Sequence, residues 1–212
     1  MKYNAVLFDL DGTLLDTLGD LHLGVNLMLE KYDYPLRTVE EIRAFVGNGA
    51  RELIRCALPA GVGEEKMETV LAEYLEWYAV NFCIKAAPYP GVKAVVDALV
   101  EQGIKAAVVS NKPDATTKAL AQMFFPGLPA FGQRDDTPKK PAPQMVWKAM
   151  EELDVTAEEA VYVGDSEVDV QTARNAGLPL VAVNWGFRTT EQLAEAGAET
   201  IVNTTEELLA AL

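Results

Sequence analysis

The feature that most limits how this chain can fold is the alternation of short apolar runs with helical segments over most of its length. The runs are rich in Val, Ile, Leu and Ala and are apolar throughout, a pattern typical of parallel strands that are covered on both faces. Strands that alternate with helices predict an α/β protein with a doubly wound parallel sheet. The expected strands are residues 5–8, 104–109, 160–163, 180–183 and 200–202, with a weaker one near 130–131.

Helical periodicity fills the segments between most of these strands. Gly103 and Gly177 follow two of the helices, as C-terminal glycine caps commonly do. Residues 156–159 read Thr-Ala-Glu-Glu, which fits either a capping box or a short turn before the next strand. The expected helices are residues 92–101, 113–124, 143–153, 167–176, 190–196 and 205–212.

One long stretch, residues 17–83, shows only helical periodicity and so differs from the rest of the chain. A Thr-Val-Glu-Glu capping box at residues 38–41 starts its second helix. Gly47-Asn48-Gly49 separates that helix from a third, and a fourth follows at residues 64–81. We therefore expect two domains, an α/β core formed by residues 1–16 and 84–212 and an inserted helical bundle formed by residues 17–83.

The net charge limits the possible partners. The 212 residues include 18 Lys and Arg and 32 Asp and Glu, which gives a formal charge of −14. This charge argues against nucleic acid or an anionic membrane as a partner, and an anionic substrate would need cations, a metal ion or helix N-termini at its site. No apolar run approaches the roughly 20 residues of a membrane helix, and no signal peptide is evident. Cys56 and Cys83 match no metal-binding spacing, and their apolar helical contexts favour buried free thiols over a disulfide, which fits a cytoplasmic location. No feature indicates an oligomeric state.

Polar residues follow three of the predicted strands at the point where each strand ends. Asp9 and Asp11 follow the first, Ser110-Asn111-Lys112 follows the second, and Gly164-Asp165-Ser166 with Asp169 follows the strand at 160–163. Ligands of open α/β sheets bind outside the carboxyl ends of the strands, so these side chains are expected to meet at one edge. A surface turn explains any one of these groups alone, but not the ordered set, in which Lys140 stands between the second and the third.

The chemistry that suits this set is phosphoryl transfer to a carboxylate. Several acids at one edge repel one another unless a cation lies among them, and carboxylate oxygens favour Mg²⁺. Lys140, the Ser110 hydroxyl and the backbone N–H groups near Gly12 and Asn111 are the candidates for binding phosphate oxygens. The residues thus predict an enzyme that uses Mg²⁺ and acts on a phosphorylated substrate.

In their order, these groups resemble the four sequence motifs of haloacid dehalogenase (HAD) superfamily phosphatases. The motifs are Asp9-Leu10-Asp11-Gly12-Thr13, Ser110-Asn111, Lys140-Pro141 and residues 164–169, and the resemblance spans essentially the whole chain. It implies a Rossmann-type core, with residues 17–83 as the helical cap of that family. Residues 45–50 with Leu53-Ile54, and the tail Trp185-Gly186-Phe187-Arg188, are similar to phosphoglycolate phosphatases. The implied substrate is a small phosphorylated metabolite, with 2-phosphoglycolate as the leading candidate.

The resemblance also implies a two-step mechanism. Asp9 would attack phosphorus to form an aspartyl-phosphate, while Asp11 would protonate the leaving oxygen and later take a proton from water. Ser110 and Lys140 would bind the transferring phosphoryl group, and Thr13 would help to position Asp11. Closing of the cap would exclude water from the nucleophile.

The same resemblance implies the metal ligands. Mg²⁺ would be held by Asp9, Asp165 and the backbone carbonyl of Asp11, and Asp169 would support the water shell of the metal or Lys140. Lys140 is preferred to Lys139 because it directly precedes Pro141-Ala142-Pro143. Glu167 either adds an acid at this edge or faces solvent at a helix start, where a negative charge is favourable.

Substrate choice would lie with the cap. Gly47-Asn48-Gly49 is either an ordinary helix connection or a loop that reaches the site and binds substrate, and the resemblance favours the loop. Arg43, Arg51 and Arg188 are candidate partners for a substrate carboxylate, which Arg binds bidentately, although each also fits an exposed surface position. His22 shares a helix face with Asn26 and Glu30, which favours a solvated face over a catalytic role.

Other functions use related chemistry. A sugar-phosphate phosphatase or mutase and a pyrophosphatase would share this site, whereas a dehalogenase needs no second acid at Asp11. A phospho-accepting signalling domain also combines an acidic magnesium site with Ser or Thr and Lys on a parallel sheet. The helical insert and Asp11 argue against that class, and the complete set of acids argues against a catalytically silent binding protein.

Overall fold

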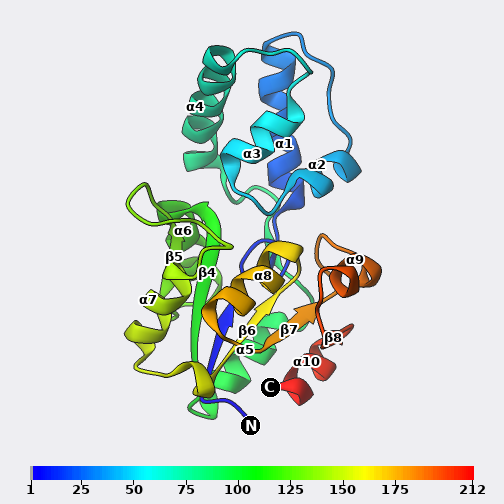
Figure 1. Cartoon of the computed structure of the whole chain (residues 1–212). Coiled ribbons are helices and arrows are strands. Elements are labelled where there is room, and N and C mark those ends of the chain that lie inside the picture. Colours follow the sequence, from blue (N-terminus) through cyan, green and yellow to red (C-terminus); the bar gives the residue numbers. More distant parts are fainter. Residues whose placement is uncertain (1) are drawn as a thin grey trace. The chain divides into compact units, whose positions relative to one another are not determined.

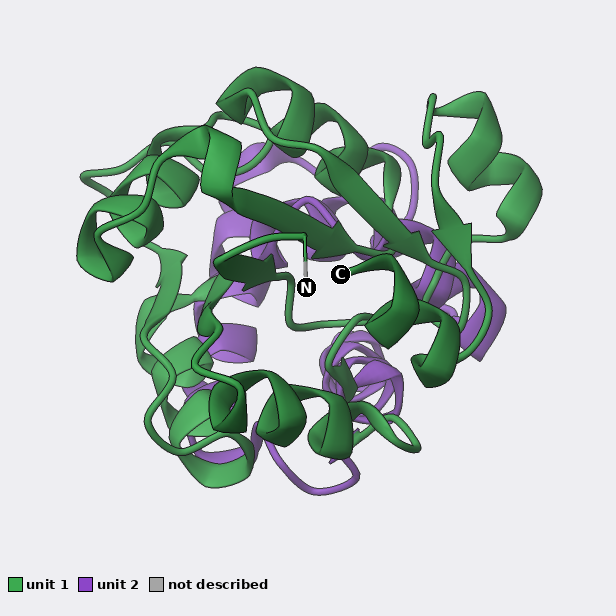
Figure 2. Ribbon diagram, turned by 90° about the horizontal axis from the view of Figure 1, so that it is seen from below, with its two compact units in different colours: residues 1–16, 88–212 green, residues 17–87 purple. Residues whose placement is uncertain are grey.

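The structure, a computed structural model, describes residues 2–212. These residues divide into two compact units, which are coloured separately in Figure 2. Unit 1 comprises the chain up to Asp16 together with Pro88–Leu212, and unit 2 is Thr17–Ala87. The α/β and helical parts expected from the sequence therefore fall into separate units.

The second boundary lies four residues later than the sequence placed it, at 87/88 instead of 83/84. The reason is the carboxylate of Asp20, which is fully buried in unit 2. It accepts hydrogen bonds from the backbone N–H groups of Ile84, Lys85 and Ala86 at 3.1, 2.8 and 2.9 Å. These bonds fasten residues 84–86 to the first helix of unit 2, a contact that no local sequence signal reveals.

Within residues 2–212, unit 1 contains one sheet of six parallel strands in the order β5-β4-β1-β6-β7-β8 (Figure 1). The chain runs from the central β1 outward through β4 and β5, and then crosses back to build β6, β7 and β8 on the other side. The predicted doubly wound parallel sheet is thus confirmed, and the strand order reverses at β1. The strands are β1 Ala5–Phe8, β4 Lys105–Pro113, β5 Ala130–Gln133, β6 Ala160–Gly164, β7 Leu180–Val183 and β8 Ile201–Val202.

Helices cover both faces of this sheet, which explains why its strands are apolar throughout. On one face, Ala5, Leu7 and Tyr162 pack with residues of α7 and α8 in a buried cluster. On the other, α5 contacts β4 and also α10, and Figure 1 shows α5 behind the sheet. The helices are α5 Val92–Glu101, α6 Asp114–Phe124, α7 Gln144–Leu153, α8 Glu167–Ala176, α9 Thr190–Glu195 and α10 Thr205–Ala211, with a 3-10 turn, η1, at Ala157–Glu159.

One strand is longer than the sequence predicted. β4 continues to Pro113 and does not end at Val109, because Pro113 pairs with Gln133 of β5 after an irregularity in the register. Ser110, Asn111 and Lys112 therefore belong to a strand and not to a loop. They lie between Val109 and Pro113, the two paired residues of β4 that flank the irregularity.

Unit 2 is helical, as predicted. Its helices are α1 Leu18–Lys31, α2 Val39–Phe45, α3 Ala50–Ala57 and α4 Glu64–Asn81. Thr38 and Glu41 form the predicted capping box at the start of α2. His22 is half-buried, not on a solvated face, because its Nε2 lies 3.1 Å from the carbonyl oxygen of Arg37 and 2.9 Å from Nδ2 of Asn26.

Two short strands, β2 Leu15–Asp16 and β3 Ala87–Pro88, pair where the chain leaves unit 1 and returns to it. Cys56 and Cys83 are free thiols, as expected, but both are half-buried and not buried as the sequence predicted. Among the helices of residues 2–212, none has the length and apolar character required to cross a membrane.

Candidate active site

Asp9 follows β1 directly and is buried, with 8% of its surface exposed. Its backbone N–H donates to the carbonyl of Val163 at 2.9 Å, so the residue is held between β1 and β6. Burial raises the pKa of the Asp9 carboxyl from 3.8 to about 7; the nearby Lys140 opposes this shift, and the charges of Asp169 and Asp11 add to it. A buried carboxylate at this place needs a cation beside it.

Lys140 supplies the nearest cation. Its Nζ lies 2.8 Å from Oδ1 of Asp9, 2.8 Å from Oδ1 of Asp169 and 3.0 Å from the hydroxyl oxygen of Tyr162. Burial by itself lowers the pKa of the Lys140 ammonium, but Asp169 and Asp9 outweigh burial and raise that pKa well above its usual value. Lys140, which is 1% exposed, is thus a charged group inside the site, whereas the alternative Lys139 is half-buried.

Asn111 fixes the backbone of Lys140. Its Nδ2 donates to the Lys140 carbonyl at 2.9 Å, and its Oδ1 accepts from the Lys140 N–H at 2.7 Å. The peptide bond between Lys140 and Pro141 is cis. The side-chain amide of Asn111 thus holds the lysine segment, and the predicted part of Asn111 in phosphate binding stays a prediction.

Asp165 and Asp169 come from the loop after β6 and the first turn of α8. Thr13 Oγ1 donates to Oδ1 of Asp165 at 3.1 Å, and the Phe187 N–H donates to its Oδ2 at 2.7 Å. Burial, together with the charges of Asp169 and Asp9, raises the pKa of the Asp165 carboxyl well above its usual value. The sequence expected Thr13 to position Asp11, whereas its hydroxyl bonds to Asp165.

Asp169 has both carboxylate oxygens engaged. Oδ1 accepts from Lys140, and Oδ2 accepts from the Ser166 hydroxyl at 2.6 Å and from the N–H groups of Asp165 and Ser166. These bonds hold the charge of Asp169 next to Lys140. The arrangement matches one of the two roles predicted for Asp169, support of the lysine.

The donor set fits a divalent cation. Carboxylate oxygens of Asp9, Asp165 and Asp169 lie within 4.8 Å of one another, and all three residues are buried. Burial and mutual repulsion disfavour the charged forms of Asp9 and Asp165, and a hard cation among them would relieve both effects. Oxygen ligands of this kind suit Mg²⁺. Asp9 and Asp165 are the better placed ligands, since each oxygen of Asp165 accepts one hydrogen bond, whereas Oδ2 of Asp169 accepts three and its Oδ1 is paired with Lys140.

Asp11 forms an ion pair with Lys112 that no local sequence pattern indicates. Nζ of Lys112 lies 3.0 and 3.1 Å from the two carboxylate oxygens of Asp11, and only 2% of the Lys112 side chain is exposed. The sequence places Lys112 just after the strand predicted to end at Val109, and no local pattern pairs it with Asp11. Within β4 it reaches Asp11 from the neighbouring strand.

Ser110 and Gly12 complete the edge of the sheet. Ser110 is 2% exposed, and its Oγ accepts from the N–H of Lys112 at 3.3 Å. Gly12 has a φ of +89°, which favours glycine, and its N–H donates to the Leu15 carbonyl at 2.9 Å. Gly12 also allows the chain to pass close to the Asp165 carboxylate, and its predicted part in phosphate binding stays a prediction.

The remaining predicted residues lie outside this cluster. Gly47, Asn48 and Gly49 connect α2 to α3 in unit 2, and their part in substrate binding stays a prediction. Of the candidate arginines, Arg51 pairs with Glu64 and Glu68. Arg188 pairs with Glu167 through two bonds of 2.6 and 3.0 Å, so these two residues bind each other at the start of α8.

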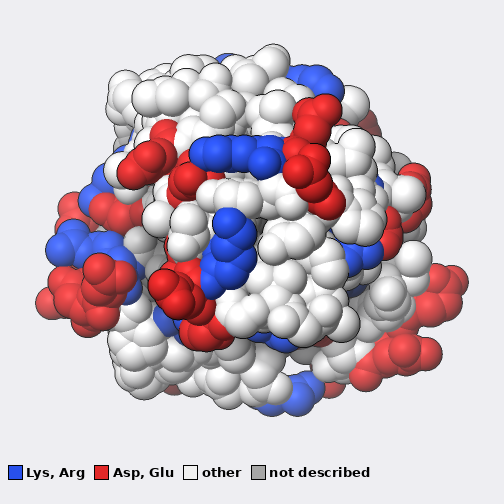
Figure 3. Space-filling view, turned by 90° about the horizontal axis from the view of Figure 1, so that it is seen from above, with Lys and Arg blue, Asp and Glu red and all other residues white. Residues whose placement is uncertain are grey.

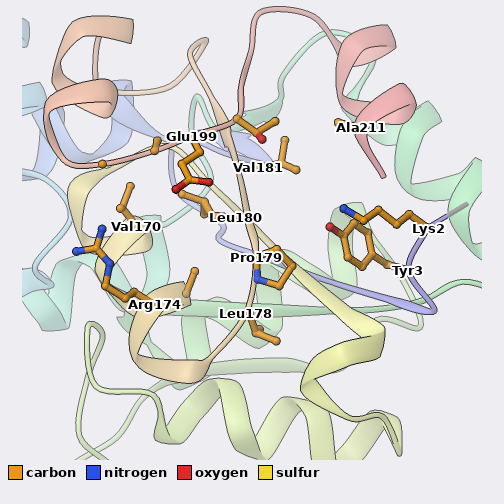
Figure 4. Close-up of a pocket in the computed structure, with 14 residues that line it drawn as sticks. Lys2, Tyr3, Val170, Arg174, Leu178, Pro179, Leu180, Val181, Glu199 and Ala211 are labelled. Atoms are coloured by element: carbon orange, nitrogen blue, oxygen red, sulfur yellow. The ribbon is translucent and has the colours of Figure 1, made fainter.

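Two surface features lie apart from the acids. A cavity of about 400 Å³ (Figure 4) lies at the amino ends of the strands, where Tyr3 precedes β1 and Leu180 begins β7. Its charged side chains, Lys2, Arg174 and Glu199, are exposed and of both signs. Figure 3 shows one face of the molecule on which Lys and Arg side chains lie among Asp and Glu side chains, without a continuous basic stripe.

Comparison with known proteins agrees with this geometry. Residues 6–183 match the family model described as haloacid dehalogenase-like hydrolase. Phosphoglycolate phosphatase 1 of Pseudomonas aeruginosa is 33% identical over 96% of this chain and 78% of its own length, and the phosphoglycolate phosphatase of Rhodobacter capsulatus is 37% identical over 88% and 86%.

A solved structure is similar along the whole chain. The crystal structure of a candidate phosphoglycolate phosphatase from Lactobacillus delbrueckii subsp. bulgaricus superimposes with a TM-score of 0.94, at 36% identity, over 100% of this chain and 98% of that one. Family model, sequence relatives and fold agree. The chain belongs to the haloacid dehalogenase-like hydrolases.

Proposed function

We propose that this hydrolase is a Mg²⁺-dependent phosphatase that acts on a small phosphate monoester through a phosphorylated Asp9. The observation that carries the proposal is the position of Asp9, a buried carboxylate 2.8 Å from the Lys140 ammonium and within a cluster of three acids. A carboxylate held this way can act as a nucleophile toward phosphorus. The cluster supplies ligands for the metal, and Lys140 supplies a positive charge for the phosphoryl group.

In the first step, an oxygen of Asp9 attacks phosphorus and the bond from phosphorus to the leaving oxygen breaks. Asp11 gives its proton to that oxygen, which leaves as an alcohol. In the second step, a water oxygen attacks phosphorus, Asp11 accepts the water proton, and the bond to Asp9 breaks to release inorganic phosphate. Mg²⁺ held by Asp9 and Asp165 would neutralise charge on the phosphoryl oxygens.

Lys112 orients Asp11 in this scheme. Its two bonds fix the plane of the Asp11 carboxylate. Ser110, buried on the same strand, is the proposed hydroxyl donor to the phosphoryl group. We assign recognition of the leaving group to unit 2, including Gly47-Asn48-Gly49.

The proposed substrate is 2-phosphoglycolate. This choice rests on relatives of that name at 33–37% identity. Among phosphate esters of different leaving groups, we expect the highest kcat/KM for 2-phosphoglycolate.

The test is phosphate release with and without Mg²⁺, measured on 2-phosphoglycolate, sugar phosphates, pyrophosphate and an aryl phosphate. We expect release that EDTA abolishes and that Asp9→Asn reduces to background, with acid-stable trapping of label on Asp9 of the wild type. Release that Asp9→Asn leaves unchanged would overturn the mechanism. Release from the aryl phosphate but not from 2-phosphoglycolate would retain the phosphatase and reject the substrate.

A further inference from the structure

The segment Trp185-Gly186-Phe187-Arg188 takes no part in the chemistry described so far, yet it contacts the site at several points. It lies in the loop between β7 and α9, residues 184–189, which we call the β7–α9 loop. Nε1 of Trp185 donates to the Thr13 carbonyl at 3.1 Å, and the Phe187 N–H donates to Oδ2 of Asp165 at 2.7 Å. Arg188 pairs with Glu167 in the first turn of α8.

Gly186 sits where no side chain fits. A Cβ added at this position would collide with the carbonyl oxygen of Gly12 and with Cβ and Oδ2 of Asp165. The φ of Gly186 lies outside the positive range, so the backbone conformation does not demand glycine. Glycine is required for a steric reason, because the β7–α9 loop passes too close to the Asp165 carboxylate to leave room for a side chain.

Gly12 approaches the same carboxylate. A Cβ on Gly12 would collide with the Asp165 side chain, and the Gly12 carbonyl oxygen is the atom that Gly186 adjoins. Asp165 thus lies against two glycines from different loops. Its two oxygens each accept a hydrogen bond from one of those loops, Oδ1 from Thr13 and Oδ2 from Phe187.

We propose that the β7–α9 loop is a positioning element of the metal site, with Gly186 and Trp185 as its positioning residues. The proposal rests on the proposed function, because it concerns the same Mg²⁺. With one hydrogen bond to each oxygen, the Asp165 carboxylate keeps a fixed orientation and still has lone pairs for a cation. Trp185 ties the loop to the segment that follows Asp9 and Asp11. The two proposed metal ligands, Asp9 and Asp165, are thereby held at a fixed position relative to each other.

The consequence is that metal affinity depends on residues that do not touch the metal. Replacing groups that hydrogen-bond to metal ligands typically lowers affinity by about 10- to 100-fold. For Gly186→Ala we expect a loss in that range, since the added methyl displaces the Asp165 carboxylate. For Trp185→Phe, which removes the indole N–H but keeps an aromatic ring, we expect a loss of about tenfold.

The experiment measures Mg²⁺ and Mn²⁺ binding to the full-length chain by titration calorimetry without substrate, and the Mg²⁺ dependence of kcat separately. Gly63→Ala is the matched control, because a Cβ at Gly63 meets no atom within 4 Å and its φ of −71° suits alanine. We expect weaker binding in both loop variants, and for Trp185→Phe a thermal midpoint close to that of the wild type. Excess Mg²⁺ should restore most of the kcat of Trp185→Phe.

Two outcomes separate this inference from the proposed function. If Asp165→Asn binds the metal as tightly as the wild type, the metal site itself is misassigned. If Asp165→Asn loses binding while Gly186→Ala and Trp185→Phe bind like the wild type, the positioning role is overturned and the proposed function stands. Should Gly186→Ala fail to fold, Trp185→Phe decides alone.

Discussion

The ammonium group of Lys140 has three hydrogens, and three oxygen atoms lie within 3.0 Å of it, on Asp9, Asp169 and Tyr162. Each partner comes from a different element: the end of β1, the first turn of α8 and the middle of β6. These three contacts together fix the orientation of the Lys140 side chain. Tyr162 was not predicted as a site residue, because a tyrosine within an apolar strand has the same sequence signature as any core aromatic.

Tyr162→Phe removes one of these three bonds and leaves the ring in place. A hydrogen bond to a charged group contributes about 1.5–3 kcal/mol, so we expect the free energy of unfolding to fall by about that amount. We also expect kcat to fall by roughly tenfold, since Lys140 becomes less well oriented. Urea unfolding and steady-state kinetics measure the two effects.

Tyr32→Phe is the control for that variant. Its hydroxyl donates to Glu73 at 2.7 Å in unit 2, at a half-buried position. This variant should lose less stability and keep its kcat. A kcat for Tyr162→Phe equal to that of the wild type would refute the orienting role of Tyr162.

The pH dependence of Asp9 follows from its burial. Its pKa rises from 3.8 to about 7 on folding without metal, so between about pH 4 and pH 7 the folded state binds more protons than the unfolded state. The contribution of Asp9 to the free energy of unfolding therefore decreases as pH rises through this window. Asp9→Asn removes this dependence on pH. In EDTA, the free energy of unfolding of Asp9→Asn should therefore exceed that of the wild type by more at pH 8 than at pH 4.

Urea unfolding at the two pH values measures this difference. Asp135→Asn, at an exposed position, is the control. Its difference from the wild type in the free energy of unfolding should change little between pH 4 and pH 8. An advantage of Asp9→Asn that shrinks from pH 4 to pH 8 would contradict the argument.

At the scale of elements, local signals predicted most of the fold. The helices Val92–Glu101 and Glu167–Ala176 and the strands Ala5–Phe8 and Leu180–Val183 match the predicted bounds, since periodicity and caps mark them in the sequence. The errors come from contacts between distant segments. β4 extends because it pairs with Gln133, and the boundary moves to 87/88 because Asp20 binds residues 84–86.

In the candidate site too, local sequence predicted some residues, and others become evident only from contacts between distant segments. Asp9 and Asp165 stood out because a charged residue at the end of an apolar strand demands an explanation, and Lys140 stood out by its place in the ordered set and before Pro141. Lys112 did not, because its partner Asp11 lies about a hundred residues away in the sequence and only the pairing of β1 with β4 brings them together. Hydrogen bonds that hold ligands in place leave no local mark on a sequence.

The attachment of residues 84–86 to α1 can be tested through Asp20. Asp20→Ala removes an acceptor of three backbone hydrogen bonds. Because the released N–H groups become partly accessible to water, we expect a loss of about 2–3 kcal/mol in the free energy of unfolding. Amide hydrogen exchange at residues 84–86 should accelerate.

Glu30→Ala on the same helix is the comparison for Asp20→Ala. Glu30 is exposed, and alanine has high helix propensity, so stability and exchange should stay close to the wild type. Unchanged exchange at residues 84–86 in Asp20→Ala would show that these bonds do not hold the segment.

At the scale of the whole molecule, the net charge of −14 opposes the approach of an anionic substrate. Salt screens this repulsion, with a Debye length of about 10 Å at 0.1 M, while the short contacts to Lys140 and the metal are screened less. We therefore expect kcat/KM for a phosphate dianion to rise as KCl is increased toward about 0.1 M at constant free Mg²⁺.

A variant with three exposed acids neutralised provides the comparison. Glu101→Gln, Glu151→Gln and Glu195→Gln together should give a shallower dependence on salt, since less repulsion remains to be screened. A kcat/KM of the wild type that falls with salt would contradict this prediction. It would mean that attraction of the substrate to cations at the site outweighs repulsion by the net charge.

The point where unit 1 releases the chain adjoins the point where it receives the chain again. The Tyr89 N–H donates to the Leu14 carbonyl at 3.1 Å, within unit 1 itself. The entropy of closing a loop between two neighbouring points grows only slowly with length, about 0.6 kcal/mol for each doubling. The core can therefore carry insertions of very different size at this junction. With leaving-group recognition in unit 2, as we propose, exchange of the inserted gene segment is a simple route by which one hydrolytic centre acquires new substrates.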